Sequence, residues 1–257
     1  MRNEIDNKKL IPVYGLLVIS CFLVVNIYNT AFKGGKFTCN RYILNTYLYI
    51  LLSLIIISLE NILLENNNVS LEEIFGRFKG TIGIIILLGI SIGLLTLVMT
   101  INPKNVIIKH LVWFVYILFL GLLAYPSYLQ TIEENTVIVT LFSTISILLM
   151  FTSIAFLKPE WISLSFVPIL VFLLLGGMIA EICFRFFNKN KNVSMKRKGF
   201  AYFFIAVFTL FILYDTKKIQ INAKNCKENK VDYINESMGI VLDALNLFQN
   251  IADVQSD

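Results

Sequence analysis

The chain has 257 residues, of which 57% are hydrophobic and only 15% are charged, and its mean hydropathy is +0.74. A water-soluble domain of this size cannot bury so much apolar surface, so the composition indicates a polytopic membrane protein and argues against a disordered chain. The net charge of +5 does not indicate nucleic-acid binding, because the basic residues lie in the short segments between apolar runs.

Seven runs are long and apolar enough, or nearly so, to cross a membrane as helices. In chain order they are Ile11–Tyr28, Tyr42–Leu59, Thr81–Thr100, Ile107–Tyr125, Val137–Leu157, Trp161–Phe187 and Gly199–Tyr214. An eighth segment, Val231–Ala252, is apolar on one side only. No hydrophilic stretch is long enough to form a second domain. The sequence therefore predicts an all-α integral membrane protein, with residues 1–257 forming a single polytopic bundle of seven or eight helices.

The positive-inside rule does not decide the orientation of this bundle. With eight crossings, the two sides of the membrane carry equal numbers of Lys and Arg. The strongest single signal is the basic segment between the sixth and seventh runs, which favours the cytosol or the matrix for that segment. It contains Arg185, Lys189, Lys191, Lys196, Arg197 and Lys198.

The cysteines form no C-x-x-C pair. They are Cys21, Cys39, Cys183 and Cys226. Cys21 and Cys183 lie in apolar runs, where a thiol behaves as a small hydrophobic group. We therefore expect neither a metal site built on cysteine nor a disulfide framework.

Asp243 lies at the centre of a polar stripe along the eighth segment. One side of this segment is apolar, with Ile234, Met238, Val241, Leu245 and Phe248 at helical spacing. The opposite side carries Glu236, Gly239, Asp243, Asn246 and Asn250. Such a helix either lies on the membrane surface or lines a water-filled cavity or cation path. Surface helices usually carry Lys and Arg on the polar side, and this segment has none, which favours the cavity.

Asp215 directly follows the seventh apolar run, and hydropathy alone places it at the membrane interface. If Asp215 and Asp243 lie close together at low dielectric, one shared proton relieves their repulsion and raises the pKa of one of them. The protonated pair can hydrogen-bond and hold its two helices together. The ionised pair separates or accepts a divalent cation such as calcium, to which Asn246 could add an oxygen ligand.

The sequence around both aspartates resembles the transmembrane Bax inhibitor motif family. Tyr214–Lys218 resembles the signature near the end of the sixth core helix of that family, and Ile240–Phe248 resembles its closing helix. Asp232, Ile234 and Asn235, and Lys109-His110-Leu111 with Trp113, are similar to the mitochondrial branch represented by growth-hormone-inducible transmembrane protein. The family-like core is 107–252, and the helices within 1–100 are poorly matched.

This resemblance implies a pH-sensitive calcium leak channel or calcium/proton exchanger that affects cell survival. It implies that Asp215 and Asp243 form the gate and the calcium-binding pair, with Asn246, His110 and Asp232 as candidate supporting residues. A histidine at the membrane edge could titrate near neutral pH, but a packing role is the favoured interpretation of His110. The membrane would be the mitochondrial inner membrane, or the endoplasmic reticulum, because the long amino-terminal targeting region of the mitochondrial branch is not found here. The expected partners are lipid, calcium, protons and cell-death or membrane-organising proteins, with no further cofactor.

Two other functions remain open from the sequence. The chain could be a non-transporting membrane scaffold that controls membrane morphology or apoptosis through partner proteins bound to the basic segments beside the seventh run. An enzyme is the weaker alternative. Intramembrane proteases use paired aspartates in a G-x-G-D-like context, which neither aspartate has, and His110 forms no recognisable triad with the scattered serines. We therefore expect no catalytic residue.

Overall fold

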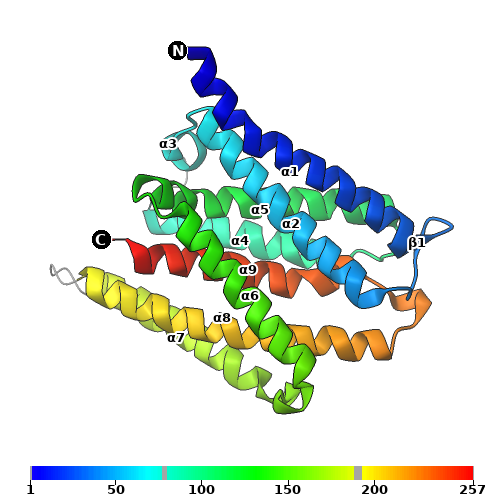
Figure 1. The fold of residues 1–257 in the computed structure, drawn as a ribbon. Coiled ribbons are helices and arrows are strands. Elements are labelled where there is room, and N and C mark those ends of the chain that lie inside the picture. The colour runs from blue at the N-terminus through cyan, green and yellow to red at the C-terminus, as the bar shows by residue number, and fades with distance from the viewer. Residues whose placement is uncertain (1, 77–79, 188–192, 257) are drawn as a thin grey trace. The chain divides into compact units, whose positions relative to one another are not determined.

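The computed structural model describes residues 2–76, 80–187 and 193–256, and most of these residues are helical (Figure 1). The chain divides into two compact units. The first consists of Met1–Pro126 and Asn225–Met238, and the second of Ser127–Lys224 and Gly239–Asp257. Two helices, α5 (Val106–Glu133) and α9 (Tyr233–Gln255), therefore contribute residues to both units.

The first unit begins with two long helices that lie side by side (Figure 1). A short hairpin joins them, and its two central residues, Gly34 and Gly35, have φ of 59° and 75°. Tight hairpin turns of this kind need positive φ at both positions, which only glycine adopts without strain. The elements are α1 (Arg2–Ala31), β1 (Phe32–Lys33), β2 (Lys36–Phe37), α2 (Tyr42–Asn66), α3 (Leu71–Phe75), α4 (Gly80–Thr100), α5 up to Pro126, η4 (Glu228–Lys230) and the first turns of α9.

The second unit is built around a long helix, α8, which packs against both α6 and α7. Its core is a cluster of buried side chains from α8 and α9: Phe204, Phe208, Ile212, Leu247 and Ile251. Because α9 contributes to this cluster, it packs against α8 and is not a helix lying alone on a membrane surface. The elements are the end of α5, α6 (Val137–Leu157), η2 (Pro159–Trp161), η3 (Leu164–Phe166), α7 (Val167–Phe187), α8 (Val193–Lys224) and the rest of α9.

All eight predicted segments are helical, and the prediction of an all-α integral membrane protein is confirmed. Among the described residues, six helical segments are long and apolar enough to cross a membrane. They are Leu10–Ala31, Tyr42–Asn66, Val106–Glu133, Val137–Leu157, Pro159–Phe184 and Arg197–Lys224. The described apolar part of α4, Ile85–Thr100, is shorter.

Helix α8 continues well beyond Tyr214, where hydropathy predicts the apolar run to end. Two polar side chains in its last turns bind backbone carbonyls around the end of α6. Lys217 Nζ donates to Pro159 O at 2.8 Å, and Gln220 Nε2 donates to Ala155 O at 2.9 Å. Carbonyls at a helix end lack intrahelical partners, so these bonds satisfy both groups. As a result, Asp215 lies inside a helix and not at its end.

The core cluster of the second unit gives a first prediction. Leu247 is fully buried. Truncating a buried leucine to alanine costs about 2–5 kcal/mol, which corresponds to roughly 5–15 °C in a chain of this size. We expect Leu247→Ala to lower the thermal unfolding midpoint of the purified protein in detergent by that amount. Leu210→Ala is the control, because Leu210 lies on α8 with 44% of its surface exposed. Equal effects of the two substitutions would contradict this packing.

Candidate functional site

The two aspartates predicted from the sequence lie together in the second unit, Asp215 on α8 and Asp243 on α9. Their carboxyl groups are close enough to interact electrostatically. Gly239, one turn before Asp243, lies against the Asp215 carboxyl group. A Cβ atom at Gly239 would lie 2.7 Å from Asp215 Cγ and would overlap one carboxyl oxygen. The close approach of the carboxyl group to α9 therefore depends on a glycine at this position.

Asp243 is buried, with 6% of its surface exposed. Its Oδ2 atom is buried and has no hydrogen-bond partner within the described part of the chain. A buried oxygen without a partner costs about 1–3 kcal/mol, and more when it is charged. Binding a proton or a cation removes this cost. The pair therefore has the chemistry of a site that takes up either a shared proton or a positive ion.

Calcium takes six to eight oxygen ligands, of which two carboxylates supply at most four. Among the residues whose side chains the structure describes, no group of three or more His, Cys, Asp or Glu gathers around a metal position. Any calcium ion at the pair must complete its shell with amides, backbone carbonyls or water. Asn246 lies one turn after Asp243, and its Nδ2 atom donates to Leu242 O at 2.8 Å within α9.

A buried lysine that the sequence analysis did not single out forms a second polar cluster, in the first unit. Lys109 is fully buried, and its Nζ atom lies 2.8 Å from Asp232 Oδ2 and 2.7 Å from Asn235 Oδ1. It also donates to Val98 O at 2.6 Å and to Ile101 O at 3.2 Å, at the end of α4. Asp232, predicted as a supporting residue of the aspartate pair, is therefore the counter-ion of Lys109. Lys109 and Asp232 both lie in the sequence segments that resemble the family. This resemblance is the feature of the sequence that could have identified them.

His110 has a partner for each ring nitrogen. Its Nδ1 atom lies 2.7 Å from Val106 O, and its Nε2 atom lies 2.7 Å from the Tyr49 hydroxyl. A carbonyl only accepts, so Nδ1 carries the proton and Nε2 accepts from Tyr49. Aromatic rings surround the imidazole, among them Phe37 and Trp113. These contacts favour a neutral packing histidine in the first unit over an ion ligand.

Glu60 on α2 is another acid that hydropathy did not single out. Its Oε2 atom is buried and has no hydrogen-bond partner in the part of the chain that the structure describes. The carboxyl group packs against Gly121 of α5, where an added Cβ would lie 2.9 Å from the Glu60 carboxyl carbon. As with Asp215, the predicted apolar run ended just before the acid, whereas the helix continues to Asn66.

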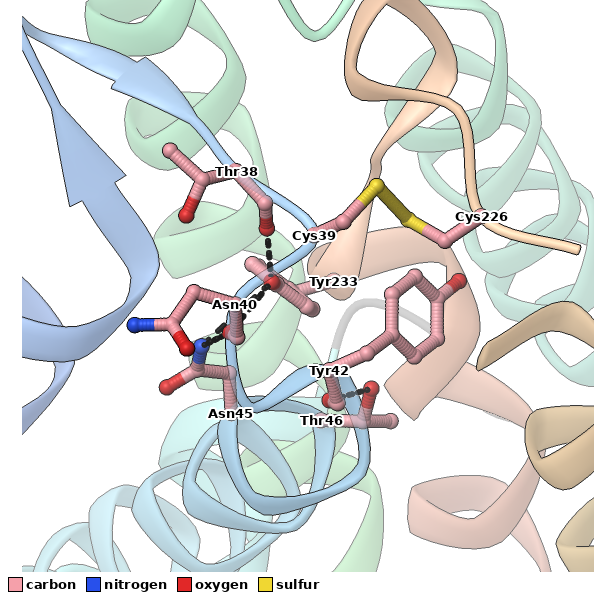
Figure 2. Close-up of a disulfide and its surroundings, with 8 residues drawn as sticks. All are labelled: Thr38, Cys39, Asn40, Tyr42, Asn45, Thr46, Cys226 and Tyr233. Atoms are coloured by element: carbon pink, nitrogen blue, oxygen red, sulfur yellow. Dashed lines mark hydrogen bonds between the residues drawn. A yellow bond between two sulfur atoms is a disulfide. The ribbon is translucent and has the colours of Figure 1, made fainter. Parts of the chain in front are cut away.

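Cys39 and Cys226 form a disulfide in the first unit (Figure 2), so the expectation of no disulfide was wrong. The two residues are 187 positions apart in sequence and their Cα atoms are 5.9 Å apart. Local spacing cannot pair cysteines that meet only through tertiary structure. Next to the bond, the Tyr233 hydroxyl donates to the carbonyls of Thr38 and Asn40 (Figure 2).

The fold and the buried acids define a class, that of polytopic helical membrane proteins with ionisable groups enclosed by their helices. The family model described as "Inhibitor of apoptosis-promoting Bax1" matches residues 39–254, and the chain belongs to this family. The match contains both Asp215 and Asp243. It begins well before Lys109, so it also includes α2 and α4, for which the sequence analysis found little resemblance. No curated protein matches the chain.

Two glycines give a matched test of the contact with Asp215. We expect Gly239→Ala to destabilise the purified protein by about 1–3 kcal/mol, because the new methyl group overlaps the carboxyl group. Gly89→Ala in α4 is the control, since a Cβ there meets nothing within 4 Å and alanine favours a helix. Thermal unfolding in detergent measures both. A Gly239→Ala protein as stable as wild type would contradict this contact.

The Lys109 cluster makes a separate prediction. Removing one partner of a buried ion pair costs about 3–5 kcal/mol, because the other charge stays buried without compensation. We expect Lys109→Met to lower the unfolding midpoint strongly, and Lys109→Met with Asp232→Asn to recover part of the loss. Lys104→Met, at an exposed lysine five residues earlier, should have little effect. A double variant no more stable than Lys109→Met would contradict the pairing.

Proposed function

We propose that the chain is a pH-sensitive cation pathway, either a calcium leak channel or a calcium/proton exchanger, in an internal membrane. The Asp215–Asp243 pair is its gate and ion-binding site. The main support is Asp243 Oδ2, a buried oxygen without a hydrogen-bond partner in the described structure, beside a second carboxyl group. Ionisable groups enclosed by membrane helices are costly and mark ion or proton pathways.

The gate works through one shared proton. At low pH the proton bridges the two carboxyl groups and holds α8 to α9, so the pathway is closed. As the pH rises the proton is lost, and two like charges remain in a medium of low dielectric. They either move apart, which opens the pathway, or bind a calcium ion in place of the proton. Calcium flux therefore increases with rising pH in the range where the pair titrates.

The family description supports a link to the inhibition of apoptosis. Transport of calcium out of an internal store is a direct route to such an effect. By resemblance to the branch of growth-hormone-inducible transmembrane protein, the membrane is the mitochondrial inner membrane, with the endoplasmic reticulum as the alternative. Calcium and protons are the transported or gating ions, and cell-death or membrane-organising proteins are proposed partners. No catalytic residue and no further cofactor are assigned.

The proposal is tested by calcium flux into proteoliposomes at a series of pH values. Because the gate binds a single proton, the calcium flux changes by at most about tenfold per pH unit. We expect Asp243→Asn to abolish this pH dependence, because an amide cannot share the proton. Glu228→Gln is the matched control, as Glu228 is an exposed acid in η4, and its pH profile should equal that of wild type.

Two results would contradict the proposal. One is an Asp243→Asn protein, folded as judged by its unfolding midpoint, with the flux and pH profile of wild type. The other is a wild-type protein that moves no calcium at any pH, which would leave the membrane scaffold as the better function.

A further inference from the structure

Three segments far apart in the sequence meet at one end of the first unit. The segment before α2 is joined to the segment before α9 by the Cys39–Cys226 disulfide (Figure 2). The segment between α4 and α5 reaches the same place, because Lys109 at the start of α5 binds Ile101 O at the end of α4 and Asp232 before α9. This end of the unit is called the disulfide end below.

The helices of the first unit run from the disulfide end to the opposite end. Near the disulfide, Asn45 in the first turn of α2 donates to the Tyr233 hydroxyl at 3.3 Å. At the far ends of α2 and α5, the Tyr125 hydroxyl donates to Val69 O at 2.8 Å. Helices α2 and α5 therefore cross the membrane in the same direction. Helix α4 begins after Val69 and ends beside Lys109, so it crosses in the reverse direction despite its shorter described apolar part.

Disulfides form and persist in oxidising compartments and are rare where cellular thiols are kept reduced. We infer that the disulfide end faces an oxidising compartment. Because α1 crosses the membrane before the hairpin, the start of α1 faces the reducing side. Because α8 crosses between its own start and Cys226, the basic segment between α7 and α8 also faces the reducing side.

The charge pattern agrees with this orientation. The basic segment between α7 and α8 is the strongest single signal in the sequence, and the positive-inside rule places it in the cytosol or matrix. The numbers of Lys and Arg on the two sides of the membrane also cease to be equal. Lys109 was counted on the opposite side, but its charge is buried and neutralised by Asp232. Without it, the side of the basic segment carries one more Lys or Arg than the opposite side.

The orientation is tested by labelling engineered cysteines in sealed membrane vesicles of known sidedness, with a maleimide that does not cross membranes. Asn67→Cys, after α2, and Lys104→Cys, between α4 and α5, replace exposed residues at opposite ends of the unit. Cys21 and Cys183 are changed to Ala in both, and the disulfide cysteines are kept. From the cytosolic or matrix side, we expect the Asn67→Cys protein to be labelled, and the Lys104→Cys protein only after permeabilisation. The reverse pattern, or labelling of both, would overturn the inference.

A second measurement uses the unmodified chain and does not depend on how the variants fold. Native membranes are treated with an alkylating maleimide under denaturing conditions, before and after reduction. We expect two further thiols to become reactive after reduction, and none in a Cys39→Ser, Cys226→Ser protein. If Cys39 and Cys226 are free thiols in the native membrane, the inference fails. Neither outcome bears on ion flux, so this inference stands apart from the proposed function.

Discussion

The proposed gate depends on the burial of one carboxyl oxygen. Asp243 Oδ2 is enclosed beside the carboxyl group of Asp215, and no donor of the described structure reaches it. Two ionised carboxylates at this position have two free-energy costs. Each loses hydration, and the two charges repel each other. A proton or a cation relieves both. In the proposed gate, this contact makes the packing of α8 against α9 depend on whether a proton or a cation is bound.

Other contacts in the second unit determine the positions of the Asp215 and Asp243 carboxyl groups. Helix α8 continues past its apolar run to Lys224, so Asp215 stays in helical structure, and Lys217 and Gln220 bind carbonyls around the end of α6. Gly239 lets the Asp215 carboxyl group lie against the backbone of α9. The cluster around Ile212 and Leu247 then holds the two helices together on the apolar side. The apolar packing therefore borders the polar contact, in which Asp243 is buried and Asp215 is half-buried.

Most of the helices could be predicted from the sequence, because they depend on local hydropathy, whereas the pairing of Asp215 with Asp243 was predicted from the family resemblance. Hydropathy predicts the seven apolar helices and helical spacing predicts the amphipathic helix around Asp243, whereas the short helix α3 (Leu71–Phe75) was not predicted. The remaining polar contacts depend on residues distant in sequence. A prediction from hydropathy ends a helix at the first charged residues. It therefore places Asp215 at the membrane interface and does not identify Glu60 as an acid inside a helix. Pairing Lys109 with Asp232, or Cys39 with Cys226, requires knowledge of which loops meet.

In the proposed gate, one carboxyl group of the pair keeps a proton where exposed aspartates, which titrate near pH 4, have lost theirs. Infrared spectroscopy of the purified protein in lipid measures this directly, through the C=O stretch of a protonated carboxyl group. For the proposed gate we expect a component of this band near neutral pH that is absent in Asp243→Asn and is lost when calcium is added, whereas a band from the buried carboxyl group of Glu60 would remain in both. A band that is unchanged in Asp243→Asn would contradict the shared proton and with it the gate.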